Sequence, residues 1–353
     1  MLREKESALR LGFTYAGCFL GAGYVSGQEL WQFFGRFGEN GFWGLLLAMA
    51  LFLFFGILLL RLIQLTGIDQ ADTLVIRRER PLLRGIVGFL QVFFLFGIFV
   101  IMAAGVGALF HQMFGLSAVW CSGVFCAAVM VLSLAGTAGM MAVFSAVVPL
   151  LVICSVLISV ITLRQGGWRQ AAELPVAANP LLRNWIVAAC SFVSYNLFSS
   201  IGILAPVGVQ IRSRRTVWLG VLLGCVVLFA IASGIFLVMQ ADPAAVSEPL
   251  PMLAVAGQAG RGWYFTYAVL LLGGMFGTSL SCVVAMQHFC YRRFPRLAGR
   301  RPLTVPALGL AAWLCSLLGF GELVGTVYPI CGYCGAFALT GLLRHRLSVR
   351  TTK

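Results

Sequence analysis

The chain has 353 residues, of which 60% are hydrophobic and only 10% are charged, and its mean hydropathy is +0.96. Soluble domains carry about 25% charged residues and have no use for repeated apolar runs of about 20 residues, each long enough to span a bilayer. The composition therefore excludes a soluble fold and predicts an all-α membrane protein.

The net charge of +14 is distributed in a way that argues against nucleic-acid binding. Basic residues gather in short loops between apolar runs, as orientation signals do. The eleven cysteines fall mostly inside apolar runs, where they act as small hydrophobic side chains. No phosphate-binding loop, no nucleophile–base arrangement and no histidines at metal-ligand spacing stand out. We therefore predict neither enzyme activity nor a bound cofactor.

Ten transmembrane helices are predicted in a single transmembrane domain, with a short external helix at 252–258. The predicted spans are residues 9–34, 42–65, 83–114, 118–135, 140–163, 185–207, 216–239, 263–290, 305–318 and 323–343. Residues 1–163 and 183–345 then each supply five spans, and an odd number of spans inverts the second half relative to the first.

The basic residues predict the orientation of this scheme. With the N-terminus in the cytoplasm, only Arg36, Arg164, Arg169, Arg183 and Arg261 lie on the outer side. Cytoplasmic loops carry an excess of lysine and arginine. Both termini are therefore predicted on the cytoplasmic side of a multi-pass protein.

The first predicted span is interrupted by glycine and polar residues. It carries Gly21, Ala22 and Gly23 at its centre and Ser26 and Glu29 about one turn further on. Glycine weakens a helix by about 1 kcal/mol relative to alanine, and a carboxylate at membrane depth is costlier still. Unwound backbone at that depth survives where it lines a cavity in the protein. These five residues are therefore predicted to bind a substrate.

The sixth predicted span has a second polar cluster. Four serines lie in 191–202 together with Tyr195 and Asn196, and Pro206 follows. We predict a second broken helix here, with Ser194, Tyr195 and Asn196 at the substrate. Tyr195 and Asn196 could equally cap the break. Interrupted helices at matching positions of two halves are typical of inverted-repeat transporters.

Glu29 admits two interpretations. It is the sole carboxylate well within the first span, so it could carry a proton or pair with a substrate ammonium group. Alternatively, it is a structural acid that accepts hydrogen bonds from freed backbone groups. Either interpretation requires it to be buried in the bundle, because a lipid-facing carboxylate is too costly.

The eighth predicted span carries Thr278 and Ser281, which are three residues apart and share a helix face. Hydroxyls and freed carbonyls are hard oxygen ligands that suit sodium. The alternative is that these hydroxyls bond the preceding turn or a neighbouring helix.

Three motifs resemble those of the YkvI-like bacterial membrane proteins, a family placed in the amino acid–polyamine–organocation transporter superfamily. They are GAGYVSGQE in the first span, SYNLFSSIGILAPVG in the sixth and VYPICGYCG in the tenth. The resemblance covers nearly the whole chain in order and implies the LeuT-type fold, a 5+5 inverted repeat with broken helices 1 and 6.

The same resemblance implies a sodium site. It would combine carbonyls near Gly17 and Leu20 with groups near Gly277, Thr278 and Ser281. One departure is that sodium-coupled relatives often place two hydroxyls side by side in the eighth span, whereas Leu280 precedes Ser281 here.

The function predicted from these features is secondary transport in the bacterial inner membrane. The solute would be an amino acid or related amine, moved by alternating access coupled to sodium or protons. The partners are the solute and the lipid bilayer, with no nucleic acid, and the oligomeric state is open. The alternative is a membrane sensor that binds a ligand in the same pocket without translocating it.

Overall fold

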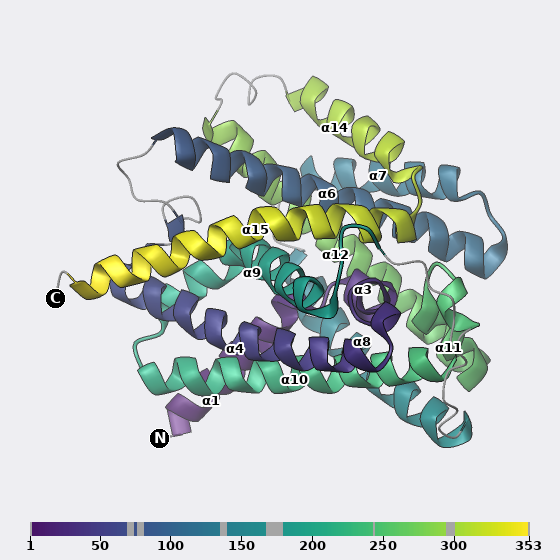
Figure 1. Cartoon of the computed structure of the whole chain (residues 1–353). Helices are drawn as coiled ribbons and strands as arrows, with labels where there is room; N and C mark the ends of the chain where they lie inside the picture. The colour runs from purple at the N-terminus through teal and green to yellow at the C-terminus, as the bar shows by residue number, and fades with distance from the viewer. Residues whose placement is uncertain are drawn as a thin grey trace.

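The computed structural model describes residues 2–68, 74–75, 81–134, 140–166, 179–242, 244–293 and 301–351. These described residues form helices and turns and contain no strand (Figure 1). The structure thus confirms the predicted all-α class.

The first predicted span consists of three helices. They are α1 (Leu2–Phe19), α2 (Ala22–Val25) and α3 (Gln28–Phe33), and the short turn η1 (Gly35–Phe37) follows. The rest of the first half comprises α4 (Glu39–Thr66), α6 (Pro81–Phe114), α7 (Ala118–Leu134) and α8 (Met140–Gly166).

The second half begins with α9 (Trp185–Gln210) and α10 (Arg214–Ala241). The turn η2 (Ala245–Ser247) and the predicted external helix, α11 (Pro251–Ala259), come next. The last three helices are α12 (Arg261–Arg293), α14 (Arg301–Ser316) and α15 (Phe320–Thr351). Each predicted span therefore coincides with helical structure.

Six of the described helices are long and apolar enough to cross a membrane, namely Glu39–Thr66, Leu82–Phe114, Trp185–Ala205, Arg214–Ala241, Arg261–Tyr291 and Phe320–His345. Three shorter apolar helices are Ala118–Leu134, Pro149–Gln165 and Leu303–Ser316. The outward-facing side chains suit a lipid environment, since Leu82, Trp120 and Leu303 are each more than 70% exposed. Six clear spans establish a membrane protein, whereas the count of ten and the 5+5 repeat stay predictions.

The predicted break in the sixth span is wrong. Helix α9 runs without interruption from Trp185 to Gln210. Its hydroxyls explain how a polar segment remains helical, because Ser194 donates to the Cys190 carbonyl (2.6 Å) and Ser200 to the Leu197 carbonyl (2.9 Å). A hydroxyl that bonds the preceding turn satisfies itself without opening the helix.

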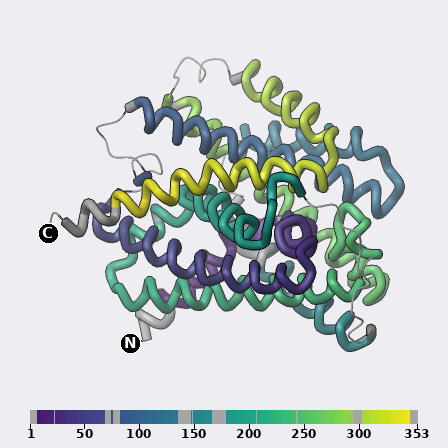
Figure 2. Tube along the Cα trace, viewed as in Figure 1, coloured from purple at the N-terminus to yellow at the C-terminus, as the bar shows by residue number. Residues whose placement is uncertain are grey.

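The interrupted first segment lies inside the bundle. Helix α1 packs along α10, and α3 contacts α9, α10 and α15. Figure 2 shows the purple coil of α3 among the helices of the second half, with α15 crossing the bundle beside it. All six residues of α3 are buried. This placement brings the polar residues of the first span away from lipid.

Candidate functional site at the helix break

The chain leaves helical geometry twice in the first segment. Leu20 and Gly21 separate α1 from α2, and Ser26 and Gly27 separate α2 from α3. The Gly21 carbonyl accepts from the amides of Tyr24 (3.0 Å) and Val25 (3.2 Å), which starts the short middle helix. Gly27 has φ +85°, a left-handed conformation that favours glycine. The predicted interruption of the first span is therefore present.

Neighbouring helices satisfy the backbone groups that the second interruption frees. The Tyr267 hydroxyl of α12 donates to the Val25 carbonyl and lies 2.9 Å from the hydroxyl of Ser155 on α8. The Met252 amide of α11 donates to the Ser26 carbonyl over 2.9 Å. The Ser26 hydroxyl itself donates to the Gly23 carbonyl (2.9 Å). The Ser26 hydroxyl therefore stabilises the backbone at the interruption, and its predicted role at the substrate stays a prediction.

Glu29 is buried in the first turn of α3, with a side chain that is 4% exposed. The Tyr195 hydroxyl of α9 donates a hydrogen bond to its Oε1 atom. Asn196 lies beside the same carboxyl group, while its amide also donates to the Phe192 carbonyl over 3.0 Å. Two predicted residues of the sixth span thus meet the predicted acid of the first.

Gly23 and Tyr328 complete the surroundings of this carboxyl group. A methyl group added at Gly23 would lie 2.9 Å from Glu29 Oε2 and 3.5 Å from the Tyr328 hydroxyl. The Tyr328 ring, on α15, stacks on the Tyr195 ring with centroids 4.7 Å apart and planes 9° apart. A side chain at position 23 would therefore displace the Glu29 carboxyl group from its present position. Tyr328 was not predicted as a site residue, although it lies in the VYPICGYCG motif.

Two glutamines extend the polar surface along α3. Gln28 and Gln32 are 6% and 5% exposed, and the Oε1 atom of each has no hydrogen-bond partner among the described residues. Both side chains face glycines of α15. A methyl group added at Gly321 would lie 2.9 Å from the Gln28 amide nitrogen, and one added at Gly325 would lie 3.1 Å from Gln32 Oε1. Buried polar atoms normally have partners, so two orphaned oxygens on the helix that carries the buried Glu29 point to a functional site.

The remaining predicted substrate residues lie in different settings. Ser194 bonds its own helix and packs at the α9–α15 contact, where its carbonyl approaches Gly335. Gly21, by contrast, borders open space, as does Gly17 one turn earlier. The side chain of Ala22 lies outside the described residues. The structure thus gathers Gly23, Glu29, Tyr195 and Asn196, and it leaves Ser194 in a packing role.

The predicted sodium ligands on α12 are in the bundle. Gly277 is buried, and Thr278 and Ser281 are half-buried. Ser279, which was not predicted, is fully buried, and its hydroxyl has no partner among the described residues. It directly follows Thr278, so two hydroxyls do stand side by side here. The sodium site with Gly17 and Leu20 stays a prediction, and the described residues contain no cluster of three His, Cys, Asp or Glu side chains.

Two curated relatives match the chain over most of its length, and no family model matches it. The membrane protein YkvI of Bacillus subtilis is 26% identical over 343 residues, covering 97% of each chain. The protein YyaD of the same organism is 25% identical over 342 residues, covering 93% of each. The chain is similar to YkvI over nearly its whole length. This confirms the resemblance carried by the three motifs.

Two solved structures show the fold. The inward-facing conformation of Mhp1 matches with a TM-score of 0.63 and 13% identity, covering 91% of this chain and 73% of that one. The Eremococcus coleocola manganese transporter, in complex with an aromatic bis-isothiourea compound, gives 0.57 and 17%, covering 94% and 78%. Both neighbours are transporters of the LeuT-type fold rather than enzymes. The chain therefore shares the helical fold of these two neighbours, whereas the ten spans and the 5+5 repeat stay predictions.

Proposed function

We propose that the protein is a secondary transporter of a small solute that works by alternating access. The observation that carries this proposal is the buried Glu29 at the broken first span, in contact with Tyr195 of α9 and against Gly23. Broken helices at the bilayer midplane are where secondary transporters bind their substrates. In this proposal the chain forms ten spans as a 5+5 repeat, although its second half supplies a continuous helix in place of a broken one.

An amino acid or related amine suits the chemistry of this site. Two acceptors on α3 lack partners among the described residues, namely the Oε1 atoms of Gln28 and Gln32, and Glu29 adds a carboxylate on the same helix. An ammonium group brings three hydrogen-bond donors and a positive charge, so it satisfies acceptors that would otherwise stay desolvated. A purely anionic solute would add charge of the same sign.

Coupling to protons or to sodium would use different parts of the molecule. Glu29 would take up and release a proton as its contact with Tyr195 is made and broken. Sodium would instead use the hydroxyls of α12, with Ser279 added to the predicted Thr278 and Ser281.

Uptake into proteoliposomes tests the proposal. The purified protein would be reconstituted and supplied with labelled amino acids and amines, with an inward sodium gradient, an inward proton gradient or neither. We expect uptake of at least one amine above protein-free liposomes, increased by one of the two gradients. Binding without flux or exchange across the panel would contradict transport and support the sensor alternative.

A further inference from the structure

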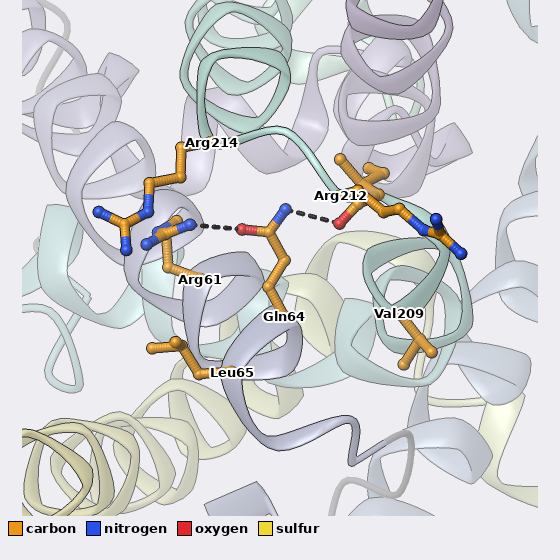
Figure 3. Close-up of a pocket in the computed structure, with 7 residues that line it drawn as sticks. Arg61, Gln64, Leu65, Val209, Arg212 and Arg214 are labelled. Carbon is orange, nitrogen blue, oxygen red and sulfur yellow. Dashed lines mark hydrogen bonds between the residues drawn. The ribbon is translucent and has the colours of Figure 1, made fainter. Parts of the chain in front are cut away.

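A polar cavity lies away from the helix break, between the end of α4 and the connection from α9 to α10. Its volume is about 340 Å³, and Figure 3 shows the residues that line it. Arg61, Gln64, Arg212 and Arg214 are the polar members of the lining. Pockets for small ligands begin at about 300 Å³, so the space is large enough for a headgroup-sized molecule.

Gln64 organises this cavity. Its Oε1 atom accepts from Arg61 Nη1 over 2.8 Å, and its Nε2 atom donates to the Ile211 carbonyl over 2.7 Å. The first bond orients the Arg61 guanidinium, and the second ties the α9–α10 connection to α4. Figure 3 shows Arg61 and Arg214 on one side of Gln64, while Arg212 extends on the other.

The lining is positive and contains no acidic side chain among the described residues. Helix α10 adds to this field, because it begins at Arg214 with Ser213 as its N-cap. The N-terminus of a 28-residue helix carries a partial positive charge and attracts anions.

Exposed apolar side chains place the cavity at the membrane surface. Trp218 lies one turn into α10 and is 55% exposed, and Val209, in the lining, is 45% exposed. Tryptophan gathers at the level of lipid headgroups, and basic pockets between membrane helices bind phosphate-bearing headgroups. We propose that this cavity binds a phosphate group, carried by an anionic lipid or by a soluble phosphate ester.

Native mass spectrometry of delipidated protein tests this site without measuring transport. The probes are phosphatidylglycerol, phosphatidylcholine and glycerol 3-phosphate. The variant Arg212→Gln/Arg214→Gln removes two charges from the lining. Its matched control, Arg215→Gln/Arg344→Gln, removes two exposed charges that lie outside the lining.

We expect the wild-type protein to retain phosphatidylglycerol in preference to phosphatidylcholine. The cavity variant should bind phosphatidylglycerol about twenty-fold more weakly, and the control should bind as the wild type does. Arg212→Lys/Arg214→Lys, which keeps the charge, should retain most of the binding. Binding of glycerol 3-phosphate as tight as that of phosphatidylglycerol would identify a soluble ester as the ligand, whereas retention of phosphatidylglycerol alone would identify the lipid. Equal losses in the cavity variant and the control, or no binding of either phosphate probe to the wild type, would overturn the proposal.

Discussion

At the scale of single residues, the Tyr195–Glu29 hydrogen bond joins the two halves of the chain at the candidate site. Glu29→Gln keeps the size of the side chain and removes its charge. We expect it to lower uptake of a cationic amine at least about tenfold, since charge-assisted bonds are roughly twice as strong as neutral ones. Initial uptake rates in proteoliposomes measure this. Glu39→Gln, at an exposed acid of α4, is the control, and equal rates in both variants and the wild type would exclude Glu29 from binding.

Gly23 provides a steric test of the same site. Gly23→Ala forces the Glu29 carboxyl group to shift, so we expect weaker solute binding. The change in Tm should be small, because the end of a glutamate side chain can move and alanine favours a helix. The control is Gly85→Ala, because that helical glycine borders open space and alanine favours a helix. Thermal unfolding with and without solute measures both effects. An unchanged solute response in Gly23→Ala would place the solute elsewhere.

Substitutions of the serines on α12 test whether these residues bind an ion or only pack in the bundle. If Ser279 only packs, Ser279→Ala removes an orphaned buried oxygen and leaves stability unchanged or improved. If Ser279 binds sodium, the same variant loses the rise in Tm that sodium gives relative to choline at equal ionic strength. We expect that loss in Ser279→Ala and a weaker response in Ser281→Ala. A wild-type sodium response in both variants would remove α12 from the ion site.

At the scale of elements, the contact between α9 and α15 depends on glycine. A methyl group added at Gly335 would lie 2.6 Å from the Ser194 carbonyl, which is backbone and cannot rotate away. We expect Gly335→Ala to destabilise the protein by about 1–3 kcal/mol, measured as a lower Tm in detergent. Gly85→Ala again serves as the control. A Tm equal to that of the wild type would show that α9 and α15 can move apart to accommodate the methyl group without a loss of stability.

The helix boundaries could be predicted from sequence because apolar runs of membrane length are conspicuous. Helix α7, for example, begins at Ala118 as predicted and ends at Leu134, one residue before the predicted end. The first break could also be predicted, since Gly21 and Gly23 weaken a helix and Glu29 must avoid lipid. The continuity of α9 could not, because composition does not reveal that Ser194 and Ser200 bond their own helix.

The partners of Glu29 were only partly predictable for a related reason. Tyr195 was predicted at the substrate, but its bond to Glu29 depends on how α9 packs against α3. Tyr328 and Gln32 join the site through the crossing of α15 and α3, which no local pattern encodes. Residue type therefore indicated which side chains were costly to bury, and tertiary packing decided which of them meet.

At the scale of the whole molecule, the distribution of arginine predicts the orientation in the membrane. The start of α1 and the end of α15 lie on the same side of the bundle as the α9–α10 connection (Figure 1). We expect green fluorescent protein fused after Lys353 to fluoresce and alkaline phosphatase fused there to be inactive. Phosphatase fused after Gly260, between α11 and α12, should be active. The opposite pattern would reverse the membrane orientation and place both termini outside.

The two interruptions in the first segment have a mechanical consequence. Helix α2 is joined to α1 and α3 by non-helical residues, Leu20–Gly21 at one end and Ser26–Gly27 at the other. It is therefore a short rigid segment between two hinges. Rotation at the two joints would swing Gly23 against or away from Glu29 while α1 and α3 keep their own axes. The first joint borders open space at Gly21, whereas the second is packed by Met239 and Met252, whose flexible thioethers can follow a moving backbone. Any such movement would break the hydrogen bonds that Tyr267 and Met252 donate to the Val25 and Ser26 carbonyls, so α2 would have to move together with α11 and α12.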